Sequence, residues 1–156
     1  MSKFCLMLVV LLLSTAPAHA QVVVNEVSPV SSPEWVELYN TSSASASLKE
    51  HAIDFGSDSQ QKSFCDAEQI GPHSYKLIIL TSSWLNNAGD TVNFRRGDDL
   101  VDSITYGTTS LPKPASETES LSRSPDGSPN WVKTGEQSKV GETVSFDCPT
   151  PPPPPP

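Results

Sequence analysis

Short runs of β-branched, aromatic and aliphatic residues recur about every eight to fifteen residues along this chain, separated by clusters of Ser, Asn, Asp, Gly and Pro. This spacing is typical of β-sandwiches, and no window carries the period of an amphipathic helix. The sequence therefore predicts an all-β domain. The expected strands are Val22–Val27, Glu34–Tyr39, Ala52–Phe55, Lys62–Cys65, Tyr75–Leu80, Thr91–Arg95, Leu100–Tyr106 and a last irregular strand ending at Trp131-Val132.

Turn-forming residues separate several of these strands. The Asn and Gly residues of segment 86–90 tolerate positive φ, which suits a tight reversal before Thr91. Segment 96–99, with the sequence Arg-Gly-Asp-Asp, predicts a hairpin. Ser124-Pro125-Asp126-Gly127 predicts another turn, so the Asp126 carboxylate has a structural role available and needs no catalytic one.

The two ends of the chain differ from its middle. Residues 1–20 have the pattern of a secretory signal peptide: Lys3, then an apolar run, then small residues ending at Ala20. The apolar run is far shorter than the roughly 20 residues that cross a bilayer. Residues 149–156 are Pro-rich and predict an extended polyproline tail, either a spacer or a ligand for aromatic grooves. We therefore expect a secreted or periplasmic protein with a signal peptide (1–20), one domain (21–148) and a tail (149–156).

The chain is acidic, with a formal net charge of -8. Removing the leader, whose only charged side chain is Lys3, makes the balance about -9. Such a charge opposes binding to nucleic acid or to anionic lipid, both of which attract clustered Lys and Arg. Arg95 and Arg96 are adjacent but fall in the predicted hairpin, where a solvated pair is the simpler interpretation.

Two cysteines, Cys65 and Cys148, remain after the leader. In an oxidising compartment a bridge between them would close a loop of about 84 residues and stabilise the fold by about 4.5 kcal/mol on the chain-entropy argument. Two free thiols are the alternative, because sequence alone does not place the two α-carbons within reach of each other.

Five segments, taken in order, resemble the lamin-tail domain in the form found on exported bacterial proteins. They are Val24-Asn25-Glu26-Val27, Glu34-Trp35-Val36-Glu37-Leu38-Tyr39-Asn40, Leu85-Asn86-Asn87-Ala88-Gly89-Asp90-Thr91-Val92, Leu100-Val101-Asp102-Ser103-Ile104-Thr105-Tyr106-Gly107 and Leu121-Ser122-Arg123-Ser124-Pro125-Asp126-Gly127. The resemblance implies an immunoglobulin-like β-sandwich, in agreement with the strand count. It departs at His51, where the family usually has a Trp, and at an insertion containing Cys65.

The resemblance also implies a modest function. Nuclear lamin tails are docking surfaces for proteins and in some cases DNA, whereas the exported bacterial forms often accompany nucleases, phosphoesterases or other hydrolases. Fold alone does not supply function. The leading hypothesis is a non-catalytic binding or structural module that docks on an envelope or extracellular protein or glycan. The alternatives are a carbohydrate-binding module, and an accessory domain of a hydrolase or a hydrolase itself.

The residues of the sequence do not predict an enzyme. No G-x-S-x-G elbow occurs, and His51 and His73 are the only histidines after the leader. Glu26, Glu34 and Glu37 fall on two strands that should be neighbours; they are expected to be solvated or structural, with a calcium site or acid–base catalysis as alternatives. No catalytic residue, metal ligand or cofactor is predicted.

The strand Glu34–Tyr39 carries the predicted binding residues. If Val36 and Leu38 point into the core, Trp35, Glu37 and Tyr39 share the opposite face, where the two rings and a carboxylate could hold a sugar chain or a partner's loop. The alternative is that a loop such as the Trp131 segment covers this face. Asn40-Thr41-Ser42, which directly follows, fits a glycosylation sequon.

Overall fold

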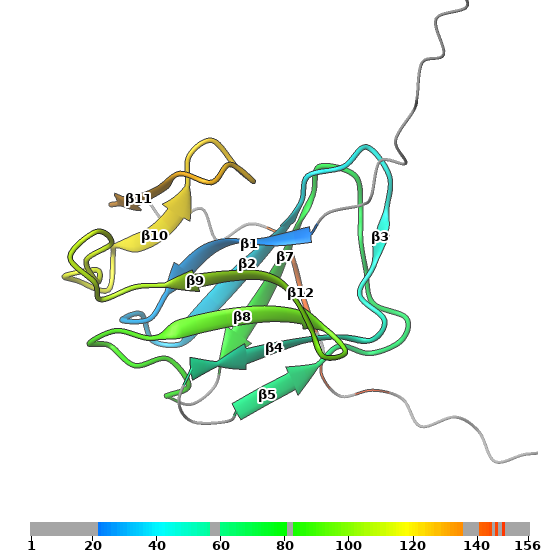
Figure 1. Ribbon diagram of the computed structural model, residues 1–156, viewed down its shortest axis with the longest axis horizontal. Coiled ribbons are helices and arrows are strands. Elements are labelled where there is room, and N and C mark those ends of the chain that lie inside the picture. Colours follow the sequence, from blue (N-terminus) through cyan, green and yellow to red (C-terminus); the bar gives the residue numbers. More distant parts are fainter. Residues whose placement is uncertain are drawn as a thin grey trace, which may run out of the picture.

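The computed structural model describes residues 22–56, 60–80, 83–135, 141–144, 146 and 148. The predicted signal peptide and the Pro-rich tail lie outside the described residues. The described part contains twelve strands (Figure 1): β1 (Val22–Ser28), β2 (Glu34–Asn40), β3 (Ala46–Ser47), β4 (His51–Phe55), β5 (Gln60–Ser63), β6 (Gln69–Ile70), β7 (Tyr75–Leu80), β8 (Thr91–Arg96), β9 (Asp99–Thr105), β10 (Ser120–Arg123), β11 (Trp131–Thr134) and β12 (Glu142–Thr143). None of the described residues belongs to a helix that could span a bilayer.

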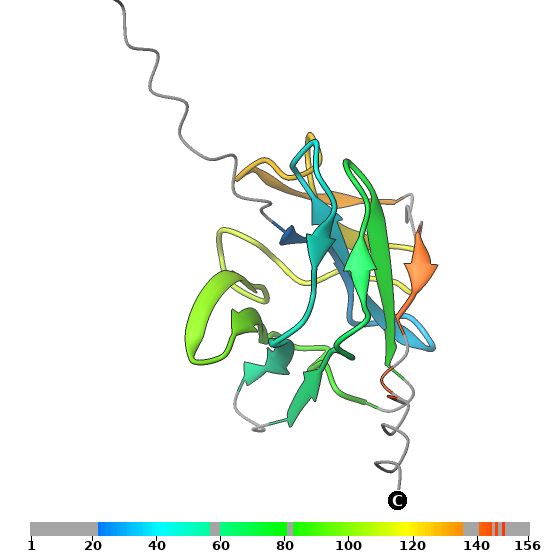
Figure 2. The same cartoon turned by 90° about the vertical axis from the view of Figure 1, so that its right-hand side faces the viewer.

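Two sheets form the body of the domain. The first has six strands in the order β11-β10-β1-β2-β7-β12, and the second has four in the order β5-β4-β8-β9. Strand β9 of the second sheet contacts β1 of the first (Figure 1). The strands pair antiparallel except β12, which runs parallel to β7 at the sheet edge (Figure 2). The result is the predicted all-β, immunoglobulin-like sandwich.

The core lies between the two sheets and follows from the alternation of side chains along each strand. Val36 and Leu38 of β2 point into it, as predicted. Each fully buried aliphatic side chain stabilises the fold by about 1.5–3 kcal/mol. The larger core side chains of the two sheets include Val24, Val36, Leu38, Ile78, Ile53, Phe55, Val92, Phe94 and Ile104.

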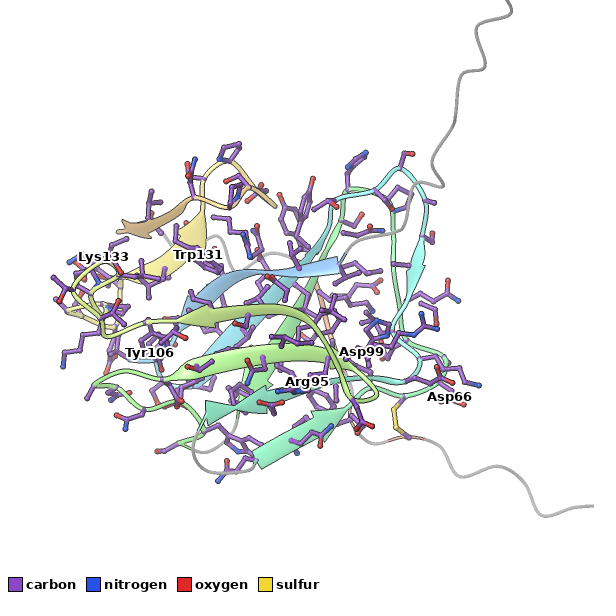
Figure 3. The ribbon with its side chains drawn as sticks, viewed as in Figure 1. Asp66, Arg95, Asp99, Tyr106, Trp131 and Lys133 are labelled. Carbon is purple, nitrogen blue, oxygen red and sulfur yellow. A yellow bond between two sulfur atoms is a disulfide. The ribbon has the colours of Figure 1, made fainter. Side chains whose placement is uncertain are left out.

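One end of the sandwich is closed where the segment after β9 meets the 86–90 turn. The Tyr106 ring is buried, and its hydroxyl donates a 2.9 Å hydrogen bond to the Asn86 carbonyl (Figure 3). Gly107 has a φ of 78°, and a Cβ added there would lie 2.4 Å from the Gly89 Cα. Only a residue without a side chain permits this approach, which accounts for Gly at both positions.

A bulge in β1 creates a polar bridge between the sheets. The register shifts between Val24 and Glu26, and the pairing with β10 is at Glu26 and Val27. The Val24 amide instead donates to Asp102 Oδ2 at 2.8 Å, and the Val24 carbonyl accepts from Arg123 Nε at 2.7 Å. Two charged side chains thus satisfy backbone groups that the ladder leaves open.

Candidate binding surface

The face of β2 opposite the core is covered. Trp35 and Glu37 are each 0% exposed, and Tyr39 is partly buried. Trp35, Glu37 and Tyr39 do share that face, but the prediction of an exposed aromatic pair is wrong. The alternative, a face covered by other parts of the chain, is the one observed, but the Trp131 segment is not the cover. The Trp131 ring stacks on the Arg123 guanidinium instead, 4.8 Å from its centre (Figure 3).

The cover at the Tyr39 end is the predicted turn at Asp126 and Gly127. The Gly127 amide donates to Asn25 Oδ1 at 3.0 Å, and Asn25 Nδ2 donates to Asp126 at 2.9 Å and to Glu37 at 3.2 Å. A Cβ on Gly127 would come within 3.2 Å of the Tyr39 ring. The bulged Asn25 therefore fastens the turn over the sheet, a long-range contact with no local sequence signal.

Tyr39 meets a second tyrosine across the sheet. Tyr75 is its register partner on β7, and the ring centroids lie 4.8 Å apart at a tilt of 35°. The Tyr75 hydroxyl donates to Asp126 at 2.5 Å. Burial raises the pKa of Tyr75, and the hydrogen bond to Asp126 and the charge of that carboxylate raise it further. Tyr75 is thus a fixed and partly exposed aromatic side chain.

The three glutamates considered as candidate acids have structural partners. Glu26 and Glu37 are register partners on β1 and β2 and are both buried, and Glu26 accepts a hydrogen bond from the Ser120 hydroxyl. Glu34 lies on the opposite face of β2 from Glu37, and its Oε2 accepts two loop amides, from Trp84 at 2.8 Å and Leu85 at 2.9 Å. Within the described segments, no three His, Cys, Asp or Glu side chains gather as a metal site requires.

The two histidines lie apart. The His51 ring stacks on Phe94, with the ring centroids 5.1 Å apart. His73 is exposed and has a left-handed φ of 47°, and its amide donates to the Ser42 carbonyl at 3.1 Å. Positive φ in a residue other than Gly is uncommon and tends to mark turns and functional loops.

The glycosylation sequon is structural in this fold. Asn40 is 0% exposed, and its Nδ2 donates to the carbonyls of Ala44, Ile70 and Gly71 at 2.7, 3.2 and 2.9 Å. Its Oδ1 accepts from both the amide and the hydroxyl of Ser42. A side chain held in this way cannot accept a glycan while the domain is folded.

The bridge expected between Cys65 and Cys148 is present, with a Cα–Cα distance of 5.3 Å (Figure 3). It fastens the segment that contains β12 to the loop after β5. That segment is also held by the β12–β7 pairing, by the burial of Val144 in the core and by the packing of Phe146 on Phe64. The disulfide therefore adds a covalent attachment to a two-residue edge strand.

An open cleft of about 460 Å³ lies where β12 meets the β6–β7 loop. Its lining residues are Gln69, Gly71, His73, Ser74, Tyr75, Lys76, Gly141 and Glu142. The Lys76 ammonium donates to Glu68 and Glu142 at 3.0 Å each. Burial lowers the pKa of Lys76, but the hydrogen bonds to Glu142 and Glu68 outweigh it and raise the pKa overall.

A second cleft, of about 470 Å³, opens between the β3–β4 segment and the β8–β9 hairpin. Its cations are paired with exposed acids: Lys49 lies 3.2 Å from Asp66, and Arg96 lies 3.7 Å from Glu50. The Arg95-Arg96 pair is divided, because Arg95 binds Asp54 at 2.6 Å (Figure 3). Each cation among the described lining residues of this cleft is therefore opposed by an acid.

The domain is immunoglobulin-like: it has two packed sheets, a polar bridge between them and clefts formed by loops at the ends. Loops commonly carry the binding functions of this class. The sequence matches the Lamin Tail Domain family over residues 15–108, more than half of the chain. The chain belongs to the lamin tail domain family, whose domain is typically non-catalytic and has binding or structural roles. No curated protein matches it significantly.

Proposed function

We propose that this chain is a secreted or periplasmic, non-catalytic module that docks on an envelope or extracellular macromolecule. The lamin tail domain family supports the binding or structural part of this proposal. The disulfide is compatible with an oxidising location outside the cytoplasm. The signal-peptide pattern of residues 1–20 supports export, and the acidic balance favours partners other than nucleic acid.

The observation that carries the proposal is the cleft beside β7, named here the β7 cleft and lined by Gln69, Gly71, His73, Ser74, Tyr75, Lys76, Gly141 and Glu142. Its volume falls within the range of ligand sites. It combines one fixed aromatic residue, Tyr75, with His73 and Ser74 of the β6–β7 loop and with polar residues of the flanking strands. Loops are the part of a sandwich that most often carries function. The glutamates that a hydrolase could use are engaged elsewhere, because Glu34 holds two loop amides and Glu26 pairs with Ser120.

Affinity capture tests the proposal. The oxidised chain beginning at Gln21 is immobilised and exposed to envelope and secreted extracts of its source, and a chain with His73→Ala and Gln69→Ala serves as the matched control. We expect a macromolecule to be retained by the natural chain and reduced on the control. Retention of nothing would contradict docking. Turnover of nucleic acid or a phosphoester that Glu34→Gln abolishes would replace the proposal with a hydrolase.

Export is tested separately by the intact mass of the natural protein recovered outside the cytoplasm. We expect a chain that begins at Gln21. A chain in that fraction that still begins at Met1 would contradict cleavage of the leader.

A further inference from the structure

The β7 cleft lies at a sheet edge whose last strand is short. β12 pairs with β7 only through Glu142 with Lys76 and Thr143 with Leu77, and the cleft opens beside the start of that pairing. One side is formed by residues of β6, of the β6–β7 loop and of the start of β7: Gln69, Gly71, His73, Ser74, Tyr75 and Lys76. Gly141 and Glu142 form the other. We propose that the β7 cleft binds an uncharged oligosaccharide, an inference that rests on the proposed docking function and names its ligand class.

Tyr75, the aromatic residue among those that line the cleft, is immobilised before any ligand arrives. Tyr75 is packed against Tyr39 at 4.8 Å, and its hydroxyl is held by Asp126 at 2.5 Å. Asp126 is itself fixed by the buried Asn25. A tyrosine held at both ends offers an amphipathic surface at little cost in conformational entropy, which suits the apolar face of a sugar ring.

The polar groups around that ring suit hydroxyls. Gln69 is exposed and supplies both a donor and an acceptor, and the exposed His73 imidazole does the same when neutral. The Ser74 hydroxyl donates to the Pro72 carbonyl at 2.9 Å and keeps its acceptor capacity. Because a sugar hydroxyl both donates and accepts, a site with both kinds of group matches it better than a site of one kind.

The charges of the cleft favour a neutral ligand. Its ammonium, on Lys76, is already bound by two carboxylates, those of Glu68 and Glu142. The Glu142 side chain is 85% exposed, so its carboxylate remains open to solvent and to a ligand's hydroxyls. Among the described lining residues the one ammonium is that of Lys76, which two acids already neutralise, so a phosphate or uronate would meet the Glu142 carboxylate in a chain of net charge -8. Anionic glycans are therefore disfavoured.

The second wall depends on the disulfide. Gly141 and Glu142 precede Val144, whose amide donates to Leu77, and Cys148 then ties the segment to Cys65. Opening the bridge leaves this wall held by one short parallel pairing and a few side-chain contacts. Oligosaccharide binding should therefore weaken on reduction, even where the rest of the sandwich stays folded.

The inference is tested by titrating the oxidised chain that begins at Gln21 with two neutral trisaccharides, followed by calorimetry and by NMR chemical shifts. One trisaccharide is of β-1,4-linked glucose and the other of β-1,4-linked N-acetylglucosamine. We expect binding that Tyr75→Ala weakens about tenfold or more. Tyr75→Phe should retain most of the affinity because it keeps the ring. Gln69→Ala, at an exposed position, should weaken binding severalfold without touching the core. Lys49→Ala, in the second cleft, is the matched control and should change nothing.

Three results would overturn the inference: no shift with any neutral trisaccharide at millimolar concentration, binding that neither Tyr75→Ala nor Gln69→Ala weakens, or stronger binding of a uronic-acid trimer. If the chain captures a macromolecule from extract through these residues but binds no sugar, the ligand class is wrong and the docking function stands. If it captures nothing and binds no sugar, both are wrong.

Discussion

One guanidinium nitrogen of Arg123 lies 2.9 Å from both carboxylate oxygens of Asp102, and this pair joins β10 of one sheet to β9 of the other. Both side chains are largely buried, with exposed fractions of 8% and 15%. Asp102 Oδ2 also accepts the Val24 amide at the β1 bulge, and Arg123 Nε donates to the Val24 carbonyl. The pair therefore supports the backbone as well as itself.

Removing Arg123 should be costly. Arg123→Met leaves the Asp102 charge buried and the Val24 carbonyl without its donor, so we expect a loss of about 3–5 kcal/mol in the free energy of unfolding. Urea denaturation measures it. The matched control is Arg96→Met, which breaks the exposed pair with Glu50 and should cost about 1 kcal/mol or less. Equal losses at the two positions would contradict the bridging role of Arg123.

Glu34 should matter for loop structure and not for chemistry. Glu34→Ala removes the acceptor of the Trp84 and Leu85 amides, so we expect a loss of about 2–3 kcal/mol by urea denaturation. Amide exchange at those two residues should accelerate as well. Glu50→Ala, whose side chain is 63% exposed, is the control and should be nearly neutral. A Glu34→Ala protein of unchanged stability would count against the structural role.

Two tyrosines should resist ionisation. Burial raises the pKa of both Tyr75 and Tyr106 above the ordinary 10.0, through the loss of solvation of the phenolate, and neighbouring carboxylates add to it. Because the folded state holds these protons more tightly, their contribution to stability is complete below pH 10 and is lost as the pH rises through the raised values. Absorbance at about 295 nm should show them ionising late, together with unfolding. Asp126→Asn should bring Tyr75 back toward 10.0; ionisation of both near that value in folded protein would contradict the account.

Strand β2 shows which features of the fold could be predicted from the sequence. Val36 and Leu38 could be assigned to the core because side chains of a strand alternate, and β7 was predicted with its observed bounds, Tyr75–Leu80. Whether the opposite face of β2 is covered or exposed stayed open, because the cover depends on contacts such as that of Asn25 with Asp126, 101 residues apart in the chain. Local pattern does not contain such pairings.

The missed strands have the same explanation. β3, β6 and β12 have two residues each, and β10 has the weak sequence Ser-Leu-Ser-Arg. Their existence depends on the neighbouring strand and not on propensity. β5 was expected at Lys62–Cys65 but spans Gln60–Ser63. The residues that pair with β4 are the polar ones, Gln60 to Ser63, and not the apolar Phe64 and Cys65. Of the cleft residues, Tyr75 was missed as a candidate since its contact with Tyr39 follows from the β2–β7 register.

The disulfide should stabilise the whole domain as well as the β12 wall. Cys65 and Cys148 are 83 positions apart, so the bridge removes a large closure entropy from the unfolded chain, about 4–5 kcal/mol on the chain-entropy argument. We expect a reductant, or Cys65→Ser with Cys148→Ser, to lower the melting temperature by several degrees or more. Non-reducing peptide mapping should recover the two cysteines joined. Two alkylatable thiols in freshly exported protein would contradict the bridge.

Hydrogen–deuterium exchange of the oxidised chain, with and without the macromolecule it captures, tests the docking claim most directly. We expect protection on binding to concentrate in residues 69–76 and at Gly141 and Glu142, which line the β7 cleft. The β8–β9 hairpin, whose Arg96 and Val101 line the second cleft, should exchange unchanged and serves as the internal reference. Protection confined to that hairpin, or spread over no cleft at all, would contradict the assignment of the β7 cleft as the docking site.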